Sequence, residues 1–193
     1  ARISEGEDVA ASLASADEGV KRLRRTLDQM MVLVRAEASI SEGDDCTSVM
    51  EVINGIAAQN GDDSRKRLTI FSEGVDAGTP IPRSMLEIAV RNLVDNALRY
   101  SPPGSTVELR ADFNGTTGYC RLEVADRGPG LSAEQTKQIG QRFWRGDQGW
   151  QHNDGAGLGI SIVRAIVERF GGRLDMKPGE SGGLVAELLV PLC

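Results

Sequence analysis

The sequence has little of what several protein classes require. Phe, Trp and Tyr make up only 4% of its 193 residues, and no stretch approaches the roughly 18 apolar residues of a membrane span. The N-terminus, ARISEGEDVAAS, is too polar for a signal peptide. A formal net charge of −6 argues against nucleic-acid binding, which needs a basic patch. The length allows one good core plus an appendage.

Cysteine is also scarce. Cys46, Cys120 and Cys193 are far apart and odd in number, and they match neither a zinc-site spacing nor a disulfide framework. We therefore expect all of them to be free thiols in a reducing cytoplasm.

The first 40 residues follow a heptad pattern that differs from the rest of the chain. Apolar residues alternate at spacings of four and three, which predicts a helix of a coiled coil or helical bundle. Such a helix cannot bury its apolar stripe alone, so it needs a partner: another helix, a second chain or both. The alternative is a helix folded back on its own domain. The seam consists of Val9, Leu13, Ala16, Val20, Leu23, Leu27, Met30 and Val34.

The sequence SEGDD at 41–45 breaks this helix, and we expect a linker over 41–46 and a separate domain over 47–193. In that domain helices are predicted over 47–60 with Thr47 or Ser48 as cap, from a Ser84 cap through Tyr100, and over 157–170. Strands are predicted over 67–71, 106–113, 119–125, 173–177 and 184–190. Residues 127–156 are rich in glycine and polar residues and are predicted to form a lid. This order predicts an α+β fold, a two-layer α/β sandwich with helices on one face of a mixed, mostly antiparallel sheet.

The stretch RNLVDNALRY at 91–100 places Asn92 and Asn96 on one face of a predicted helix. An amide oxygen can ligate Mg²⁺, and an amide NH₂ can donate to a phosphate oxygen. If this helix faces a nucleotide, Asn96 could hold Mg²⁺, and Asn92 could contact phosphate or support the metal shell. Arg99 would add positive charge near the phosphates, and Tyr100 would pack on a base or ribose. Taken alone, the asparagines also fit helix caps or exposed neighbours, and Arg99 fits a solvated surface residue.

The sequence DRGPG at 126–130 follows a predicted strand directly. The carboxylate of Asp126 could accept from an exocyclic amine such as that of adenine. Gly128 and Gly130 would let the backbone approach a flat base without a Cβ. The alternative is an ordinary turn after a strand.

The sequence GAGLGIS at 155–161 places Gly155, Gly157 and Gly159 at the start of a predicted helix. Free N–H groups and the positive end of the helix dipole make such a terminus a phosphate cradle. No strand immediately precedes it, as in a Rossmann fingerprint, and no GK[ST] follows, as in a Walker loop.

Two aromatic residues stand in the predicted lid, in the sequence RFWRG at 142–146. Phe143 and Trp144 suggest that the lid docks on an apolar surface, and Phe143 could also anchor the loop in the core. Arg145 could reach a terminal phosphate.

In this order, the four blocks resemble the nucleotide-binding boxes of the sensor histidine kinases, within the superfamily that includes gyrase, Hsp90 and MutL. The resemblance covers about 47–193, and 18–38 looks like the second helix of the family's dimerisation and phosphotransfer bundle. It implies the Bergerat ATP-binding fold preceded by a dimerisation-type helix, with ATP and Mg²⁺ as cofactors. The implied catalytic residues are Asn92, Asn96 and Arg145, with Asn96 on the metal. The implied nucleotide-binding residues are Asn92, Asn96, Arg99, Tyr100, Asp126, Gly128, Gly130, Leu131, Phe143, Gly155, Gly157, Leu158 and Gly159.

One residue separates the subclasses of this superfamily. Its ATP-hydrolysing members typically carry Glu where this chain has Asn92, and an amide cannot act as a general base. We therefore expect a protein-histidine kinase module, which transfers phosphate to a nucleophilic imidazole. The alternatives are a gyrase- or MutL-type ATPase and a nucleotide-binding module that has lost catalysis.

The resemblance also implies a phosphoacceptor histidine on a first bundle helix, which is not found here. The only histidine, His152, lacks the acidic neighbour and basic-proline context of an acceptor, so we expect it to be an exposed loop residue. The chain would then be a fragment that binds ATP but does not phosphorylate itself. The implied parent is a homodimeric membrane sensor with this module in the cytoplasm of a bacterium and a response regulator downstream. Contact with the membrane would come only through missing parent segments, and no direct contact with nucleic acid is expected.

Overall fold

The computed structural model describes residues 46–59, 66–116, 118–139, 144, 157–179 and 182–193. The predicted heptad helix and residues 41–45 of the predicted linker lie outside these ranges. The same holds for Phe143, Arg145, His152 and Gly155.

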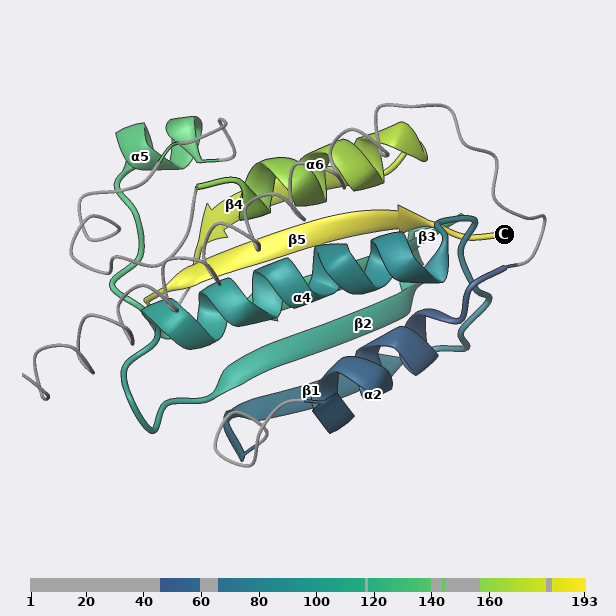
Figure 1. The fold of residues 1–193 in the computed structure, drawn as a ribbon, viewed down its shortest axis with the longest axis horizontal. Helices are drawn as coiled ribbons and strands as arrows, with labels where there is room; N and C mark the ends of the chain where they lie inside the picture. Colours follow the sequence, from purple (N-terminus) through teal and green to yellow (C-terminus); the bar gives the residue numbers. More distant parts are fainter. Residues whose placement is uncertain (1–45, 60–65, 117, 140–143, 145–156, 180–181) are drawn as a thin grey trace, which may run out of the picture.

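The described residues form a five-stranded sheet in the order β1-β2-β3-β5-β4. Strand β1 runs parallel to β2, and all other neighbours are antiparallel, so the predicted mixed, mostly antiparallel sheet is confirmed. Helices α2, α4 and α6 cover one face of the sheet (Figure 1). The elements are α2 Val49–Gln59, β1 Leu68–Glu73, α4 Arg83–Tyr100, β2 Val107–Thr116, β3 Tyr119–Ala125, α5 Ala133–Gln138, α6 Gly159–Arg169, β4 Arg173–Pro178 and β5 Leu184–Pro191.

Buried and partly exposed side chains alternate along the strands, which gives the sheet one buried face and one solvent-facing face. On β3, Leu122 and Val124 are buried against the helices, while Arg121 and Glu123, which alternate with them, point to the other side. The helix-covered face forms a single apolar core. The opposite face carries ion pairs such as Arg121–Asp112 at 2.8 Å. This difference between the two faces of the sheet gives the predicted two-layer arrangement. No helix in the described parts of the chain is long and apolar enough to cross a membrane.

The N-termini of α2 and α4 are built differently. The backbone N–H of Glu51 donates to Ser48 Oγ at 3.0 Å, so Ser48 rather than Thr47 caps α2. The prediction that Ser84 caps α4 is wrong, because the cap position is Pro82 and no side chain caps the helix. The fixed φ of Pro82, −53°, leads the chain into the helix at Arg83, which leaves Ser84 inside the first turn.

Asp76, in the loop before α4, also holds the start of α2. Ser48 Oγ donates to Asp76 Oδ2 at 2.7 Å, Met50 N–H donates to Oδ2 at 3.0 Å, and Gly78 N–H donates to Oδ1 at 2.9 Å. Burial raises the pKa of this carboxyl group, but the hydrogen bonds from Met50, Ser48, Gly78 and Val49 outweigh burial and hold the pKa below its ordinary value. Asp76 is therefore a structural carboxylate.

The predicted lid is not entirely a loop. It contains the short helix α5, which begins with a capping box: Gln135 N–H donates to Ser132 Oγ at 3.2 Å, and Ser132 N–H donates to Gln135 Oε1 at 3.0 Å. The S-x-x-Q signature is visible in the sequence, but the surrounding glycine and polar residues obscured it.

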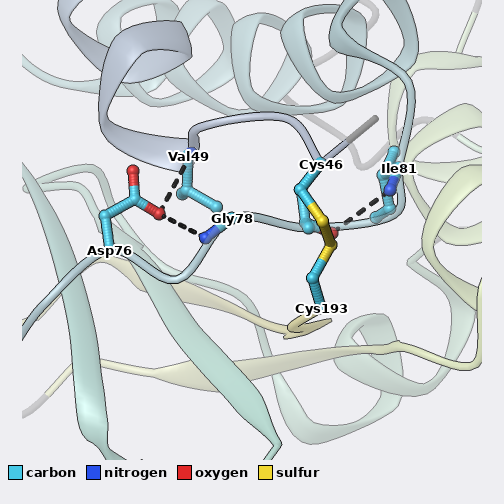
Figure 2. Close-up of a disulfide and its surroundings, with 7 residues drawn as sticks. Cys46, Val49, Asp76, Gly78, Ile81 and Cys193 are labelled. Atoms are coloured by element: carbon cyan, nitrogen blue, oxygen red, sulfur yellow. Dashed lines mark hydrogen bonds between the residues drawn. A yellow bond between two sulfur atoms is a disulfide. The ribbon is translucent and has the colours of Figure 1, made fainter. Parts of the chain in front are cut away.

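The expectation of free thiols is wrong for Cys46 and Cys193, which form a disulfide with a Cα–Cα distance of 6.3 Å (Figure 2). They are 147 positions apart in the sequence, and the sheet brings them together. Thr47 pairs with Thr79 in an isolated bridge, and Cys193 N–H donates to Gly78 O at 3.2 Å. Spacing along the chain could not reveal a pairing that depends on the tertiary fold.

Cys120 is the one cysteine that remains a free thiol. It lies on the buried face of β3. Burial, together with the negative charges of Asp76 and Asp112, raises the pKa of this thiol to about 12. The group is therefore protonated and shielded at neutral pH.

Candidate functional site

The predicted site residues that the structure describes lie on α4, just after β3 and at the start of α6. Figure 1 shows that the C-terminus of α4 and the N-terminus of α6 lie at the same end of the molecule. Asn92 and Asn96 lie on α4 and face the first residue of α6. A Cβ added at Gly159 would lie 2.9 Å from Asn92 Oδ1 and 3.5 Å from Asn96 Nδ2. The asparagine block on α4 and the second glycine block thus lie close together, and a side chain at position 159 would press on the amide of Asn92.

The amide of Asn92 is oriented by its own helix. Its Nδ2 donates to the backbone oxygen of Ile88 at 2.8 Å, one turn earlier, and this leaves Oδ1 directed toward Gly159. A rotation of the Asn96 side-chain amide by 180° would exchange its nitrogen and oxygen and bring Oδ1 toward Gly159. Both residues are half-buried. Mg²⁺ needs only one or two protein oxygens when phosphates and waters supply the rest, so this pair of amides fits that ion.

The start of α6 offers backbone groups. Leu158 is the N-cap residue, and no side chain caps the helix. Gly157 precedes it with φ +70°, a left-handed conformation that favours glycine. The first N–H groups of an α-helix have no intrahelical acceptor, and the positive end of the helix dipole lies there. This terminus is suited to phosphate oxygens.

Asp126 follows directly after β3, as predicted. Its Oδ1 accepts from Gly128 N–H at 2.7 Å and from Leu184 N–H at 3.1 Å. Burial raises the pKa of this carboxyl group above its ordinary value, and the bonds from Gly128 and Leu184 offset only part of that rise. Among the described residues, these hydrogen bonds all use Oδ1. Oδ2 is the atom that remains to accept from a ligand.

Gly128 and Gly130 have a role that the sequence did not reveal. A Cβ on Gly128 would lie 2.9 Å from Tyr100 O, at the end of α4. Gly130 has φ +72°, and a Cβ there would lie 3.2 Å from Gly183 O. Both glycines thus allow the loop to pack on other backbone segments. The predicted close approach to a base stays a prediction.

The family model of the histidine kinase-, DNA gyrase B- and HSP90-like ATPases matches residues 82–193, which hold α4, β3, α6 and the whole of the site just described. The chain belongs to this family. The match begins at the N-cap of α4, so the convergence of α4 and α6 is a feature of the matched segment itself.

The relatives of this histidine kinase-like ATPase domain are sensor kinases. The sensor protein QseC of Escherichia coli O157:H7 is 32% identical over 187 residues, which are 92% of this chain and 38% of the relative. The sensor protein kinase PmrB of Pseudomonas aeruginosa is 30% identical over 192 residues, 94% of this chain and 38% of the relative. The chain thus spans well under half the length of these relatives.

Solved structures agree with this assignment. The mycobacterial sensor histidine kinase MprB matches with a TM-score of 0.67 and 26% identity over 77% of this chain and 98% of that chain. The predicted α+β fold is thereby confirmed. The chain is the ATPase or kinase module of the two-component sensor histidine kinases.

Other predicted residues of this kinase module take varied positions. Arg99 and Tyr100 are exposed on the last turn of α4, and the backbone of Tyr100 lies against Gly128 in the Asp126 loop. Leu131 is half-buried just after that loop. Leu158 is 1% exposed and belongs to the core, so the site can use its backbone but not its side chain. In the lid, Trp144 Nε1–H donates to an oxygen of Gln138 in α5 at 2.6 Å.

The sequence did not point to several residues that hold Asp126 and Arg127 in place. Leu184, at the start of β5, pairs with Asp126 through both backbone groups, since Asp126 N–H also donates to Leu184 O at 3.0 Å. Gly183 lies so close to Asp126 O that a Cβ would not fit. Ser101 is 6% exposed, and its Oγ accepts from Arg127 N–H at 3.1 Å. Only the Gly-Gly pair before β5 gives a sequence signal.

Proposed function

We propose that this module binds Mg-ATP where α4 meets α6 and transfers the γ-phosphoryl group to a histidine outside these 193 residues. The observation that carries the proposal is the convergence of Asn92 and Asn96 on Gly159, at a helix N-terminus suited to phosphate. Asp126, with Oδ2 available, lies on the same end of the sheet for an adenine amino group.

Each group has a distinct task in this proposal. Asp126 accepts from the adenine amino group, and the first N–H groups of α6 hold phosphate oxygens. Asn96 ligates Mg²⁺, while Asn92 supports the metal shell or contacts phosphate. Mg²⁺ supplies neutralisation of the charge that develops during phosphoryl transfer. Arg145 is assigned to the terminal phosphate by its place in the sequence alone.

Asn92 favours a kinase over a hydrolase. An amide cannot remove a proton from water, so the site has no general base at this position. A neutral imidazole has its own lone pair and needs no such activation. A histidine acceptor is therefore the better match for these residues than water, as in a gyrase-type ATPase.

The relatives suggest the setting of this reaction. QseC and PmrB are named as sensor proteins. In this proposal the module works in a homodimeric sensor and passes its phosphoryl group to a response regulator. Segments outside the chain would attach the sensor to a bacterial inner membrane, with this module on the cytoplasmic side. ADP would be the product that leaves the site.

The test supplies the acceptor separately. The chain is mixed with Mg²⁺, γ-labelled ATP and a helical hairpin that carries the acceptor histidine of the parent protein. Acid-labile label on the hairpin, and none on the chain itself, is the expected result. The same mixture with Asn96→Ala should show no transfer. Release of labelled phosphate at the same rate with and without the hairpin would instead identify a hydrolase, and absence of Mg-ATP binding would reject the proposal.

A further inference from the structure

Arg67, the residue before β1, closes the C-terminal end of α4. Its Nε–H donates to Ser105 O at 3.0 Å. Its Nη2 donates to Leu98 O at 3.2 Å, to Ser101 O at 3.3 Å and to Pro102 O at 3.2 Å. The last carbonyls of a helix have no intrahelical donors, and a cation near them is favoured by the helix dipole. One planar guanidinium therefore fixes the segment that follows α4.

That segment is the surface on which the first glycine loop rests. Ser101 Oγ accepts from Arg127 N–H at 3.1 Å, and Ser101 is almost fully buried. The next residue of the loop, Gly128, packs so closely on Tyr100 that a Cβ would lie 2.9 Å from Tyr100 O. The position of the loop is thus set by the backbone of Tyr100 and the side chain of Ser101, and Arg67 holds the backbone on either side of Tyr100 through Leu98 O and Ser101 O.

The same loop fixes the carboxylate assigned to the base. Gly128 N–H donates to Asp126 Oδ1 at 2.7 Å, so a displacement of Gly128 changes the direction of Asp126 Oδ2. Arg67 is not among the contacts of Asp126, and its effect passes through the end of α4. We infer that Arg67 is a positioning residue for nucleobase recognition, which sets how well the site distinguishes a purine with a 6-amino group from one without it. This inference rests on the proposed function.

The test compares ATP with ITP, in which a carbonyl oxygen replaces the 6-amino group. Dissociation constants of both nucleotides are measured by calorimetry on the 193-residue chain in excess Mg²⁺. The wild type should prefer ATP by at least about 30-fold, because ITP places an acceptor against the Asp126 carboxylate. In Arg67→Gln the preference should fall to about 5-fold or less, mostly through weaker ATP binding. A residue that only stabilises the fold would lower the melting temperature without changing this ratio.

Matched variants separate the outcomes. Arg83→Gln removes the arginine at the start of α4, whose 2.9 Å ion pair with Glu51 is exposed, and it should leave the ATP-to-ITP ratio unchanged. Arg67→Lys should be intermediate, since one ammonium cannot reproduce the fork of donors. If Arg67→Gln does not fold, Ser101→Ala decides, with an expected fall of about 3-fold in the ratio through loss of its bond to Arg127.

An unchanged ratio in folded Arg67→Gln, or in Ser101→Ala when that variant has to decide, would overturn the inference while leaving the proposed function intact. A wild type that binds ATP and ITP equally would overturn both the inference and the role of Asp126. A wild type that binds neither nucleotide would overturn the proposed function as well.

Discussion

Asp76 and Asp126 lie at opposite ends of the sheet, and both accept backbone N–H groups. Residue Ala125, next to Asp126, pairs with Val185 at the start of β5, whereas the end of β5 leads to the Cys46–Cys193 disulfide beside the Asp76 loop. Both oxygens of Asp76 are used by α2 and its own loop. In the described structure, Asp126 uses only Oδ1.

The pKa values of the two carboxyl groups shift in opposite directions, because the two groups accept different numbers of hydrogen bonds. Burial raises both, but only Asp76 has enough hydrogen bonds to bring its pKa below the ordinary value, and the pKa of Asp126 stays raised. A carboxylate whose acceptor sites are filled stabilises the fold. A desolvated carboxylate with one oxygen that accepts no hydrogen bond from the described residues is suited to bind a ligand. The disulfide end is therefore structural, whereas the Asp126 end has the properties that the proposed nucleotide site requires.

The largest effect expected is on stability, from removal of the disulfide. Cys46→Ser with Cys193→Ser should lower the free energy of unfolding by about 3 kcal/mol, because the bond closes a loop spanning 147 positions. The dissociation constant for Mg-ATP should change by less than about 2-fold, since the bond lies at the other end of the sheet. Urea titration and calorimetry measure the two quantities. As a control, reductant should destabilise the wild type but not this variant. A large loss of ATP affinity in the variant would contradict the proposed division between a structural end and a binding end.

Asp126→Asn should have the largest effect on binding. It replaces a charged acceptor in a desolvated site, and we expect about a 100-fold weaker affinity for Mg-ATP, equivalent to about 2.7 kcal/mol. Calorimetry in excess Mg²⁺ gives the value. The matched variant Asp76→Asn should keep the wild-type affinity. Equal losses in both variants would show that Asp126 acts only through folding.

Asp76→Asn should instead lower the free energy of unfolding by about 1.5 kcal/mol through loss of the α2 cap. The folded pKa of Asp76 is depressed below its ordinary value of 3.8. Its stabilisation is therefore complete above about pH 3.8 and is lost as the pH falls through the lower folded pKa. Urea titrations of both proteins across this range should converge at the acidic end, and a difference that grows on acidification would contradict the assignment.

The smallest effect concerns Gly159→Ala. The new Cβ would press on Asn92 Oδ1 at 2.9 Å, so Mg-ATP affinity should fall about 5-fold, while the better helix propensity of alanine keeps the stability close to wild type. Gly55→Ala is the matched control, because a Cβ at this position in α2 meets nothing within 4 Å. It should add about 0.5–1 kcal/mol of stability and leave affinity unchanged. Normal affinity in Gly159→Ala would indicate that the Asn92 amide is not part of the site.

The sequence predicted the elements of this module well because their signals are local. Strand alternation placed β3 at residues 119–125, and the strand-to-glycine transition placed Asp126 at its end. Helical spacing put Asn92 and Asn96 on one face, where the structure brings them to Gly159. Each of these depends on neighbours within a few positions, which is what periodicity reports.

What the sequence did not predict depends on distant contacts. The Cys46–Cys193 bond, the cap that Asp76 gives to α2, and the bonds from Arg67 to the end of α4 all join segments far apart in the chain. The true start of α4 was missed for a different reason, because Pro82 competes with Ser84 as a local start signal. For the same kind of reason the capping box of α5 was hidden by its glycine-rich surroundings.

Hydrogen exchange with and without Mg-ATP tests the division between the two ends most directly. Mass spectrometry of the whole chain reports amide protection segment by segment. We expect ATP to slow exchange in residues 126–131 and 157–161, where Asp126 and the start of α6 bind it, with no change in residues 46–51 and 76–81 around the disulfide. Protection confined to the disulfide end, or none at either end at saturating Mg-ATP, would contradict the account.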